Sequence, residues 1–486
     1  MAAVLSGSPA RRETIWQRLR ALSLRAAVSN PLSHPPLALA AAWAPSTAYL
    51  AGNVVSNGGN LYECHTAGTS AALGGPGETG AGQIADGTAA WVYAGVHPVA
   101  MASPLVPTIT HFNGDSPAGL EKRYTIGANV FPPNDVALTG SMVRVVGGAV
   151  RVEDSTIWRF PSLTTFNNQS GNIENGTAST PGLAGMLAGI EFRTDAPRVA
   201  FLWSFGQLFR LFVDGVRVWP GVQRGGAGGG VQGPCIDYTA AGGRNDRLWR
   251  IEFKGNVQFL GICVDLGSSI SYPHATDAIR FIALGDSHTG IANGFPIFPG
   301  DGWVDQLGKR MGWADCRPSG AGGTGYTTGG PSNLPKPMER LGDLIGHAPD
   351  VAGFAFGSND GGAGPAATTA AALACFQAAR AALPGVPLFV WGVPASVNKS
   401  LAAAISTENA VFAAVTQAND NLLIPVPVST DADPWFTGTG FVSAPTGSGN
   451  NDFYVSSDEV HGTNSWHAHW AARSATELRR IIAARA

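Results

Sequence analysis

Short apolar runs alternate with longer, helix-like segments along the C-terminal part of the chain. The first run, Phe281–Leu284, stops abruptly at Gly285, which is typical of a buried parallel strand. Strands are predicted at 279–285, 314–318, 351–357, 387–393 and 422–427, and helices near 302–311, 336–346, 366–383, 400–418 and 464–484. This alternation predicts an α/β fold, a flavodoxin-like doubly wound parallel sheet with right-handed crossovers.

A different pattern fills residues 105–275, where short β-like runs are separated by glycine and polar turns. Residues 209–218 alternate apolar and polar side chains around Asp214-Gly215, which is a hairpin-turn signal. The runs lie at 141–152, 189–192, 199–204, 209–218, 248–253 and 257–265. They predict an antiparallel β-sandwich, jelly-roll-like in size, before the α/β domain.

A small unit rich in aromatic residues precedes the sandwich, from residue 42 to about residue 95. Its spaced aromatics, glycine turns and the Asp-Gly-Thr segment at 86–88 predict short strands. The pattern resembles the chitin-binding-like carbohydrate modules that also occur in phage tail proteins. The resemblance implies that Trp43, Tyr62 and Trp91 stack on sugar rings. The alternative is that these three residues form the core of a tiny domain.

Residues 12–28 place apolar side chains at helical spacing between arginines. They predict a short amphipathic helix that docks on this protein, on a partner in an oligomer or on a larger assembly. Prolines between residues 31 and 36 exclude a continued helix. The predicted organisation is a helix and linker (1–35), a small carbohydrate-binding-like β module (36–100), a β-sandwich (101–275) and the α/β domain (276–486).

Composition and charge narrow the function classes. The 486 residues carry a formal net charge of -3, so no basic field favours nucleic acid or an anionic membrane as a partner. The five cysteines are scattered without CxxC spacing, so neither a disulfide framework nor a zinc site is expected. No apolar run is long enough for a membrane span, and arginines such as Arg11, Arg12 and Arg18 interrupt any signal-peptide core. Localisation stays open between virion association and export by a non-standard route.

Four polar or glycine-rich islands follow predicted strands or precede the last helix. The first contains Ser287, directly after the first strand of the α/β domain, and the others are 319–326, 357–360 and 458–462. The carboxyl ends of parallel strands meet at one edge of the sheet, where ligands bind in such folds. We therefore expect the four islands to converge.

Together the islands supply what acyl transfer requires. A neutral serine hydroxyl is a weak nucleophile, and His461 is a candidate base that takes its proton, with Asp458 orienting the imidazole ring. The oxyanion of a tetrahedral intermediate needs fixed donors. Candidates are the side-chain amide of Asn359 and the backbone N–H groups of Gly323 and Ser287.

These blocks, GDS at 285–287, the glycine loop at 320–325, GxND at 357–360 and DxxH at 458–461, resemble the SGNH hydrolases, also called the GDSL esterase/lipase family. The resemblance implies that Ser287 is the nucleophile, His461 the base and Asp458 its orienting acid. It also implies an oxyanion hole made by Ser287, Gly323 and Asn359. The second block lacks the family's usual asparagine, which leaves Gly322 and Gly323 as alternatives. The alternative is a purely structural role, in which DxxH caps a helix and Asn359 forms a turn.

Other kinds of site fit the residues of these segments less well. The GxGxxG spacing at 320–325 opens no helix, because glycines and prolines follow it, so a dinucleotide site is rejected. His467 and His469 lie two apart and diverge on a helix, so a metal site with His461 is not expected. No GxSxG elbow occurs, which counts against an ordinary α/β-hydrolase. No metal and no cofactor are expected.

The sequence therefore predicts a modular serine esterase. Esterases with a β-sandwich before an SGNH domain resemble carbohydrate deacetylases, so the expected reaction is removal of O-acetyl groups from a polysaccharide. The alternatives are a lipase or thioesterase of the same fold, and a phage tail-type structural protein whose domain only binds glycan.

Overall fold

The computed structural model divides into two compact units. The first comprises Met1–Met101, Ile279–Pro296 and Asp301–Ala486, and the second comprises Ala102–Ala278 and Ile297–Gly300. The structure describes residues 15–20, 22–23, 41–49, 54–58, 60–78, 83–96, 107–113, 117–125, 144–147, 151–152, 158–159, 187–204, 208–218, 223–224, 232–254, 258–273, 279–290, 298–313, 315–331 and 334–485.

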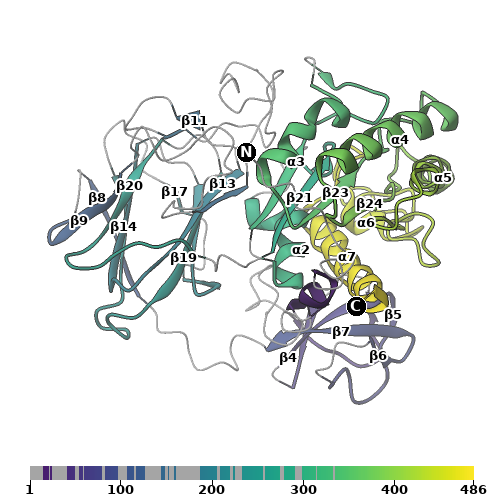
Figure 1. Cartoon of the computed structure of the whole chain (residues 1–486). Coiled ribbons are helices and arrows are strands. Elements are labelled where there is room, and N and C mark those ends of the chain that lie inside the picture. The colour runs from purple at the N-terminus through teal and green to yellow at the C-terminus, as the bar shows by residue number, and fades with distance from the viewer. Residues whose placement is uncertain are drawn as a thin grey trace. The chain divides into compact units, whose positions relative to one another are not determined.

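The C-terminal domain is built on a five-stranded parallel sheet (Figure 1). Its strands are β21 (Arg280–Gly285), β22 (Asp315–Gly320), β23 (Val351–Ala355), β24 (Leu388–Trp391) and β25 (Leu423–Val426). The spatial order β22-β21-β23-β24-β25 is the 2-1-3-4-5 order of flavodoxin-like sheets. The predicted α/β fold class is therefore confirmed, because each short apolar run finds a buried place between two neighbours.

Helices cover both faces of this sheet, as a doubly wound fold requires. On one face Phe281 and Trp391 share a buried cluster with Trp303 of α2 and Trp470 of α7, whereas on the other face Phe354 packs against α4. The helices are η3 (Pro299–Asp301), α2 (Trp303–Met311), η5 (Pro337–Arg340), α3 (Leu341–His347), α4 (Pro365–Ala382), α5 (Leu401–Ala418), α6 (Asn451–Tyr454) and α7 (Asn464–Arg485).

The predicted N-terminal helix is present over residues 15–20 and 22–23. Trp16 and Leu19 are buried in the same hydrophobic cluster as α2 and α7, and Ile15 and Leu22 pack against it. The Arg485 guanidinium at the end of α7 lies 5.5 Å from the Trp16 ring. The sequence left three docking partners open for this helix. Its described residues dock on their own chain.

The small N-terminal module is a strand-rich unit with its own core. Tyr62 and Trp91 have no exposed surface, so these two side chains are core residues and are not available to stack on a sugar ring, which corrects that expectation. Half-buried Trp43 and buried Trp91 both donate their indole N–H to Asp86, each over 2.8 Å. The strands are β1 (Ala41–Ala42), β2 (Ala48–Tyr49), β3 (Val54–Asn57), β4 (Asn60–Thr66), β5 (Gly68–Thr69), β6 (Gln83–Asp86) and β7 (Ala89–Val96).

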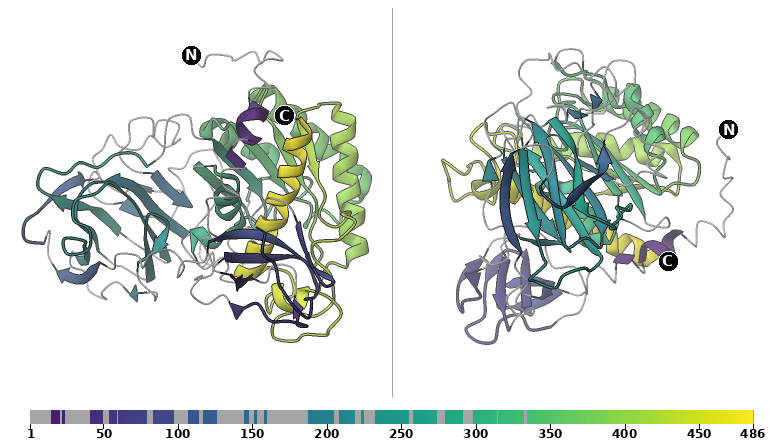
Figure 2. Two further views of the ribbon diagram at one scale, coloured as in Figure 1. Left: turned by 90° about the horizontal axis from the view of Figure 1, so that it is seen from below. Right: turned by 90° about the vertical axis from the view of Figure 1, so that its left-hand side faces the viewer.

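The second unit is a sandwich of two antiparallel sheets that face each other (Figure 2). One sheet has the order β10-β13-β19-β15-β16 with β17 on β15, and the other has the order β11-β12-β20-β14-β18-β8 with β9 on β20. The strands are β8 (Thr108–Asn113), β9 (Leu120–Thr125), β10 (Arg144–Gly147), β11 (Arg151–Val152), β12 (Trp158–Arg159), β13 (Leu187–Thr194), β14 (Arg198–Ser204), β15 (Leu208–Val213), β16 (Val216–Arg217), β17 (Gln223–Arg224), β18 (Gln232–Asp237), β19 (Arg247–Lys254) and β20 (Gln258–Asp265).

Inward-facing side chains of both sheets fill the sandwich. Ile190 and Trp249 come from one sheet and Phe201 and Ile262 from the other, and all four have no exposed surface. The predicted turn at Asp214-Gly215 joins β15 to β16 with both residues at positive φ, 52° and 77°. That geometry belongs to a type I′ hairpin, for which Asp-Gly is favoured.

No helix in the described parts of the chain is both long enough and apolar enough to cross a membrane.

Candidate active site

The predicted site residues follow three strands of the parallel sheet or precede its last helix. Ser287 follows β21, the glycine loop follows β22, and Asn359 follows β23. Asp458 and His461 lie in the loop before α7. Each of these four side chains is half-buried, so each combines a defined position with access from solvent.

Ser287, His461 and Asp458 form one hydrogen-bonded chain. The Ser287 Oγ atom lies 2.8 Å from His461 Nε2, and His461 Nδ1 lies 2.6 Å from Asp458 Oδ2. Both imidazole nitrogens are thereby engaged, one by a hydroxyl and one by a carboxylate. This geometry can remove a proton from the serine while the carboxylate stabilises the imidazolium that forms.

The Asp458 carboxylate is held ionised by its surroundings. Burial acts to raise its pKa, but hydrogen bonds from the backbone N–H and the ring of His461 outweigh burial and lower the pKa to about 2. The Oδ1 atom accepts the backbone N–H of His461 over 2.9 Å and that of Val460 over 3.1 Å, and it also accepts the Ser456 hydroxyl. The Asp458 carboxylate is thus held in place through Oδ1 and is hydrogen-bonded to the imidazole through Oδ2.

The glycine loop turns tightly beside the serine. Gly322 and Gly323 are the central residues of a turn in which the Thr324 N–H donates to the Ala321 carbonyl over 3.3 Å. Gly323 has a φ of 71°, a conformation that favours glycine, and a Cβ atom on Gly322 would lie 3.9 Å from the Ser287 Cβ. Both alternatives from the sequence therefore belong to this turn.

Asn359 is fixed on the glycine loop by one of its two amide protons. Its Nδ2 atom donates to the Thr324 carbonyl over 2.9 Å. An asparagine amide has two N–H donors, and among the described contacts of Asn359 only one of them is bonded.

Asp360, to which the sequence assigned no role, ties the glycine loop to the loop after β23. It is fully buried and accepts the backbone N–H groups of Tyr326 and Thr327 over 2.9 and 2.7 Å. It also accepts the Thr327 hydroxyl over 2.6 Å. Its position next to Asn359 was the available signal, but its partners could not be seen in the sequence.

We predict that Asp360→Asn lowers kcat on a small ester about tenfold and changes KM little. The asparagine keeps the shape but replaces one acceptor oxygen with a donor, so the two loops lose part of their shared hydrogen bonding. Steady-state kinetics on p-nitrophenyl acetate measure the effect. The control is Asp420→Asn, since Asp420 binds Arg380 at the opposite edge of the sheet, before β25. An unchanged kcat in Asp360→Asn would contradict the positioning role.

Arg340 supports the strand end that delivers the serine. This buried guanidinium donates to the Gly285 carbonyl over 3.1 Å, and it also donates to the carbonyl of Ser319. The Ser319 hydroxyl in turn lies 2.6 Å from Asp343. Arg340 therefore ties the ends of β21 and β22 together directly before Ser287.

His288 and Asp286 flank the serine inside the protein. The His288 ring stacks on Trp466 at 5.1 Å and lies 5.4 Å from the His461 ring. Burial, and next the charge of His461, lower the pKa of His288 well below its ordinary value. Burial raises the pKa of Asp286 to about 7. His288, the residue after Ser287, is thus a buried residue that packs against Trp466 beside the site.

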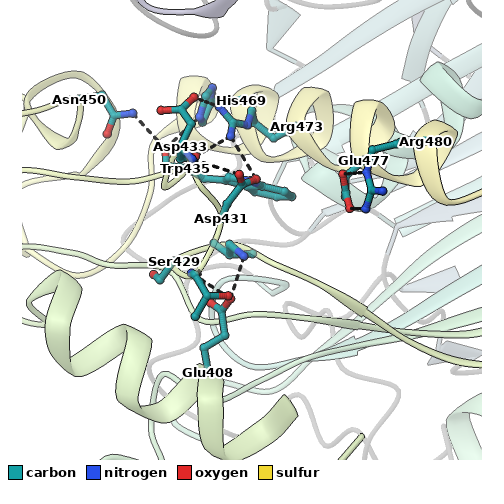
Figure 3. Close-up of polar contacts among 12 residues, drawn as sticks. Glu408, Ser429, Asp431, Asp433, Trp435, Asn450, His469, Arg473, Glu477 and Arg480 are labelled. Atoms are coloured by element: carbon teal, nitrogen blue, oxygen red, sulfur yellow. Dashed lines mark hydrogen bonds and ion pairs between the residues drawn. The ribbon is translucent and has the colours of Figure 1, made fainter. Parts of the chain in front are cut away.

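Two further carboxylate systems hold the loops that follow β24 and β25 (Figure 3). Glu408 is fully buried and accepts the backbone N–H groups of Val393 and Ser429 over 3.0 and 2.8 Å. Arg473 on α7 donates to Asp433 over 2.6 Å and to Asp431 over 3.3 Å. These contacts fix the ends of neighbouring strands and the helix that follows His461.

A flavodoxin-like sheet with serine, glycine, asparagine and Asp-x-x-His blocks at its carboxyl edge defines the class of SGNH ester hydrolases, and the C-terminal domain is one of them. Residues 283–468 match the GDSL-like Lipase/Acylhydrolase family. Residues 42–84 match carbohydrate-binding module family 5/12. The chain thus combines an ester hydrolase domain with a carbohydrate-binding module, as its sequence predicted.

Several solved structures are similar to part of the chain. The salicylyl-acyltransferase SsfX3 from a tetracycline biosynthetic pathway is 13% identical, with a TM-score of 0.48 over 70% of this chain and 95% of that chain. A family two carbohydrate esterase from Clostridium thermocellum is 16% identical, with a TM-score of 0.45 over 70% of this chain and 99% of that chain. A family two carbohydrate esterase from Corynascus thermopiles (Myceliophthora fergusii) is 21% identical, with a TM-score of 0.44 over 71% of this chain and 99% of that chain. No curated protein matches the chain.

Proposed function

We propose that the C-terminal domain hydrolyses acyl esters, with Ser287 as nucleophile, His461 as general base and acid, and Asp458 as the orienting carboxylate. The observation that carries this proposal is the hydrogen-bonded chain of 2.8 and 2.6 Å that runs from the serine through the imidazole to the aspartate. Attack by Oγ on the ester carbonyl forms an acyl-enzyme and releases the alcohol, which takes its proton from His461. Water then attacks the acyl-enzyme, with His461 again acting as base.

The negative charge on the tetrahedral intermediate needs donors fixed in advance. We assign this role to the backbone N–H groups of Ser287 and Gly323 and to the free amide proton of Asn359. Each such donor contributes about 3 kcal/mol of transition-state stabilisation in serine hydrolases. The tethering of Asn359 to the glycine loop supports this assignment, because it keeps two of the three donors in one rigid unit.

The proposed substrate is an O-acetylated polysaccharide. The match of residues 42–84 to carbohydrate-binding module family 5/12 supports a sugar as the alcohol component. A module tethered to the catalytic domain raises the effective concentration of substrate near the serine. The proposal that the acyl group is acetyl is more specific than the proposal of a sugar ester, and it is tested separately.

We predict that hydrolysis of p-nitrophenyl esters is fastest for acetate and falls steeply as the acyl chain lengthens. Release of p-nitrophenol and of the corresponding carboxylic acid is measured for the acetate, butyrate and octanoate esters, with wild type and Ser287→Ala side by side. Turnover that rises with chain length would replace the deacetylase with a lipase or thioesterase. Turnover that persists in Ser287→Ala would assign the nucleophile to another residue, and no turnover at all would favour a domain that only binds glycan.

A further inference from the structure

Lys399 lies in the loop between β24 and α5, and this loop is anchored to the loop that carries Asp458 and His461. The Asn398 backbone N–H donates to the Glu459 carbonyl over 3.2 Å. Within the loop, the Lys399 N–H donates to the Ser396 hydroxyl over 3.1 Å, and the Ser396 N–H donates back to the Lys399 carbonyl over 2.9 Å. The backbone of Lys399 is therefore held in place beside the site.

The ammonium group of Lys399 reaches toward the loop that carries Asn359. A Cβ atom on Gly361, two residues after Asn359, would lie 3.6 Å from Lys399 Nζ. The charge of Lys399 also acts on Asp286 and His288, the two neighbours of Ser287 in the chain. The approach of Nζ to Gly361, together with the effect of its charge on both neighbours of Ser287, thus locates this cation near the site.

The Lys399 side chain is half-buried, yet among the described residues no carboxylate lies within ion-pair distance and no acceptor bonds its Nζ atom. Lys309, by contrast, is paired with Asp305 over 2.7 Å. Of the two nearby acids, Asp360 is bonded to the glycine loop, and Asp286 accepts the His288 backbone N–H through Oδ1. Partial burial removes some of the water around this ammonium group and lowers the pKa of Lys399, so an anionic ligand at Nζ would offset the lost hydration.

We propose that Lys399 binds a carboxylate carried by the substrate and thereby makes the domain selective for acidic esters. The inference rests on the proposed function, since it concerns the substrate of that same site. On a polysaccharide the carboxylate belongs to a uronic acid residue that bears, or adjoins, the ester. A carboxylate at the far end of the acyl group has the same chemistry, and the experiment separates the two sources.

The test compares kcat/KM for matched neutral and acidic esters. One pair is acetylated methyl glucoside and acetylated methyl glucuronoside, and the other is the acetyl and succinyl ester of one neutral alcohol. Wild type is expected to prefer the acidic member of one pair by about 10- to 100-fold, the usual effect of one charge-assisted hydrogen bond. Whichever pair shows the preference identifies the position of the carboxylate.

The variants assign that preference to Lys399. Lys399→Met is expected to abolish it, Lys399→Arg to restore part of it, and the charge-matched control Lys309→Met to leave it at the wild-type level. The preference should also weaken with salt, because the charge is partly exposed. Equal rates on neutral and acidic esters in wild type, or an undiminished preference in Lys399→Met, would overturn the inference.

A binding measurement separates this inference from the proposed reaction. Calorimetry with Ser287→Ala, with and without Lys399→Met, measures the affinity for the two acetylated glycosides and for methyl succinate, none of which is consumed. Lys399-dependent binding of an acidic ligand, combined with no turnover by the wild type, would refute the esterase and uphold the role of Lys399. Turnover without any preference for acidic esters would uphold the esterase and refute the role of Lys399.

Discussion

Ser287→Ala is expected to lower kcat on p-nitrophenyl acetate by about 10⁵-fold, which corresponds to about 7 kcal/mol of transition-state stabilisation. The variant lacks the atom that forms the acyl-enzyme, and His461 Nε2 loses its partner at 2.8 Å. The oxyanion donors remain, so a residual rate above that of water is expected. Stopped assays at high enzyme concentration are needed to measure it.

The fold should survive this substitution, since Ser287 is only half-buried and its hydroxyl bonds His461 alone among the contacts that the structure describes. Thermal unfolding of the variant is therefore expected to match that of wild type. Ser457→Ala is the matched control, because it removes an exposed hydroxyl from the loop of Asp458. Activity of Ser287→Ala within tenfold of wild type would assign the nucleophile elsewhere.

The parallel sheet was predictable because its strands have no other environment that suits them. A run such as Val351–Ala355, apolar at nearly every position, must be buried on both faces, and only a sheet covered on both sides provides this. Predicted and observed elements agree closely, for example 464–484 against Asn464–Arg485. In the sandwich, β18 was missed because Gly233 and Pro234 interrupt its pattern, although both residues pair with β8.

Burial of the module's aromatics was not predictable, because core and sugar-binding side chains show the same spacing along short strands. Tyr62 and Trp91 are core residues for a tertiary reason, since the Trp91 indole N–H requires an acceptor and Asp86 supplies it inside the module. Which side of a strand faces the core depends on pairing between segments that are distant in the sequence.

The proposed reactive residues were easier to find in the sequence than the residues that hold them. Serine, histidine and aspartate are the residue types that the proposed chemistry requires, and four short blocks in order, three after strands and one before the last helix, point to them. Glu408 and Arg340 instead bind backbone groups of distant loops, and a backbone N–H or carbonyl leaves no trace in the sequence. The proposed role of Lys399 was equally invisible in the sequence, because it depends on the observation that no acceptor among the described residues bonds its Nζ atom.

The second large effect is expected from Asp458→Asn, which should lower kcat by about 10⁴-fold, or about 5.5 kcal/mol. The asparagine keeps the shape of the side chain, and its oxygen can still accept the backbone N–H groups of Val460 and His461. Its NH₂ group then faces His461 Nδ1, which must become an acceptor. The ring proton moves to Nε2, so the imidazole donates toward Ser287 and can no longer take its proton.

Three measurements test this account of Asp458. Nitrogen NMR of the histidine ring should show the proton on Nδ1 in wild type and on Nε2 in Asp458→Asn. The pKa of Asp458 is lowered from 3.8 to about 2 in the folded protein, so its stabilising contribution is present above the unfolded value and is lost as the pH falls through about 2. The difference in unfolding temperature between wild type and Asp458→Asn should therefore be largest at neutral pH and vanish in strong acid. A variant with kcat within tenfold of wild type would show that the carboxylate does not orient the base.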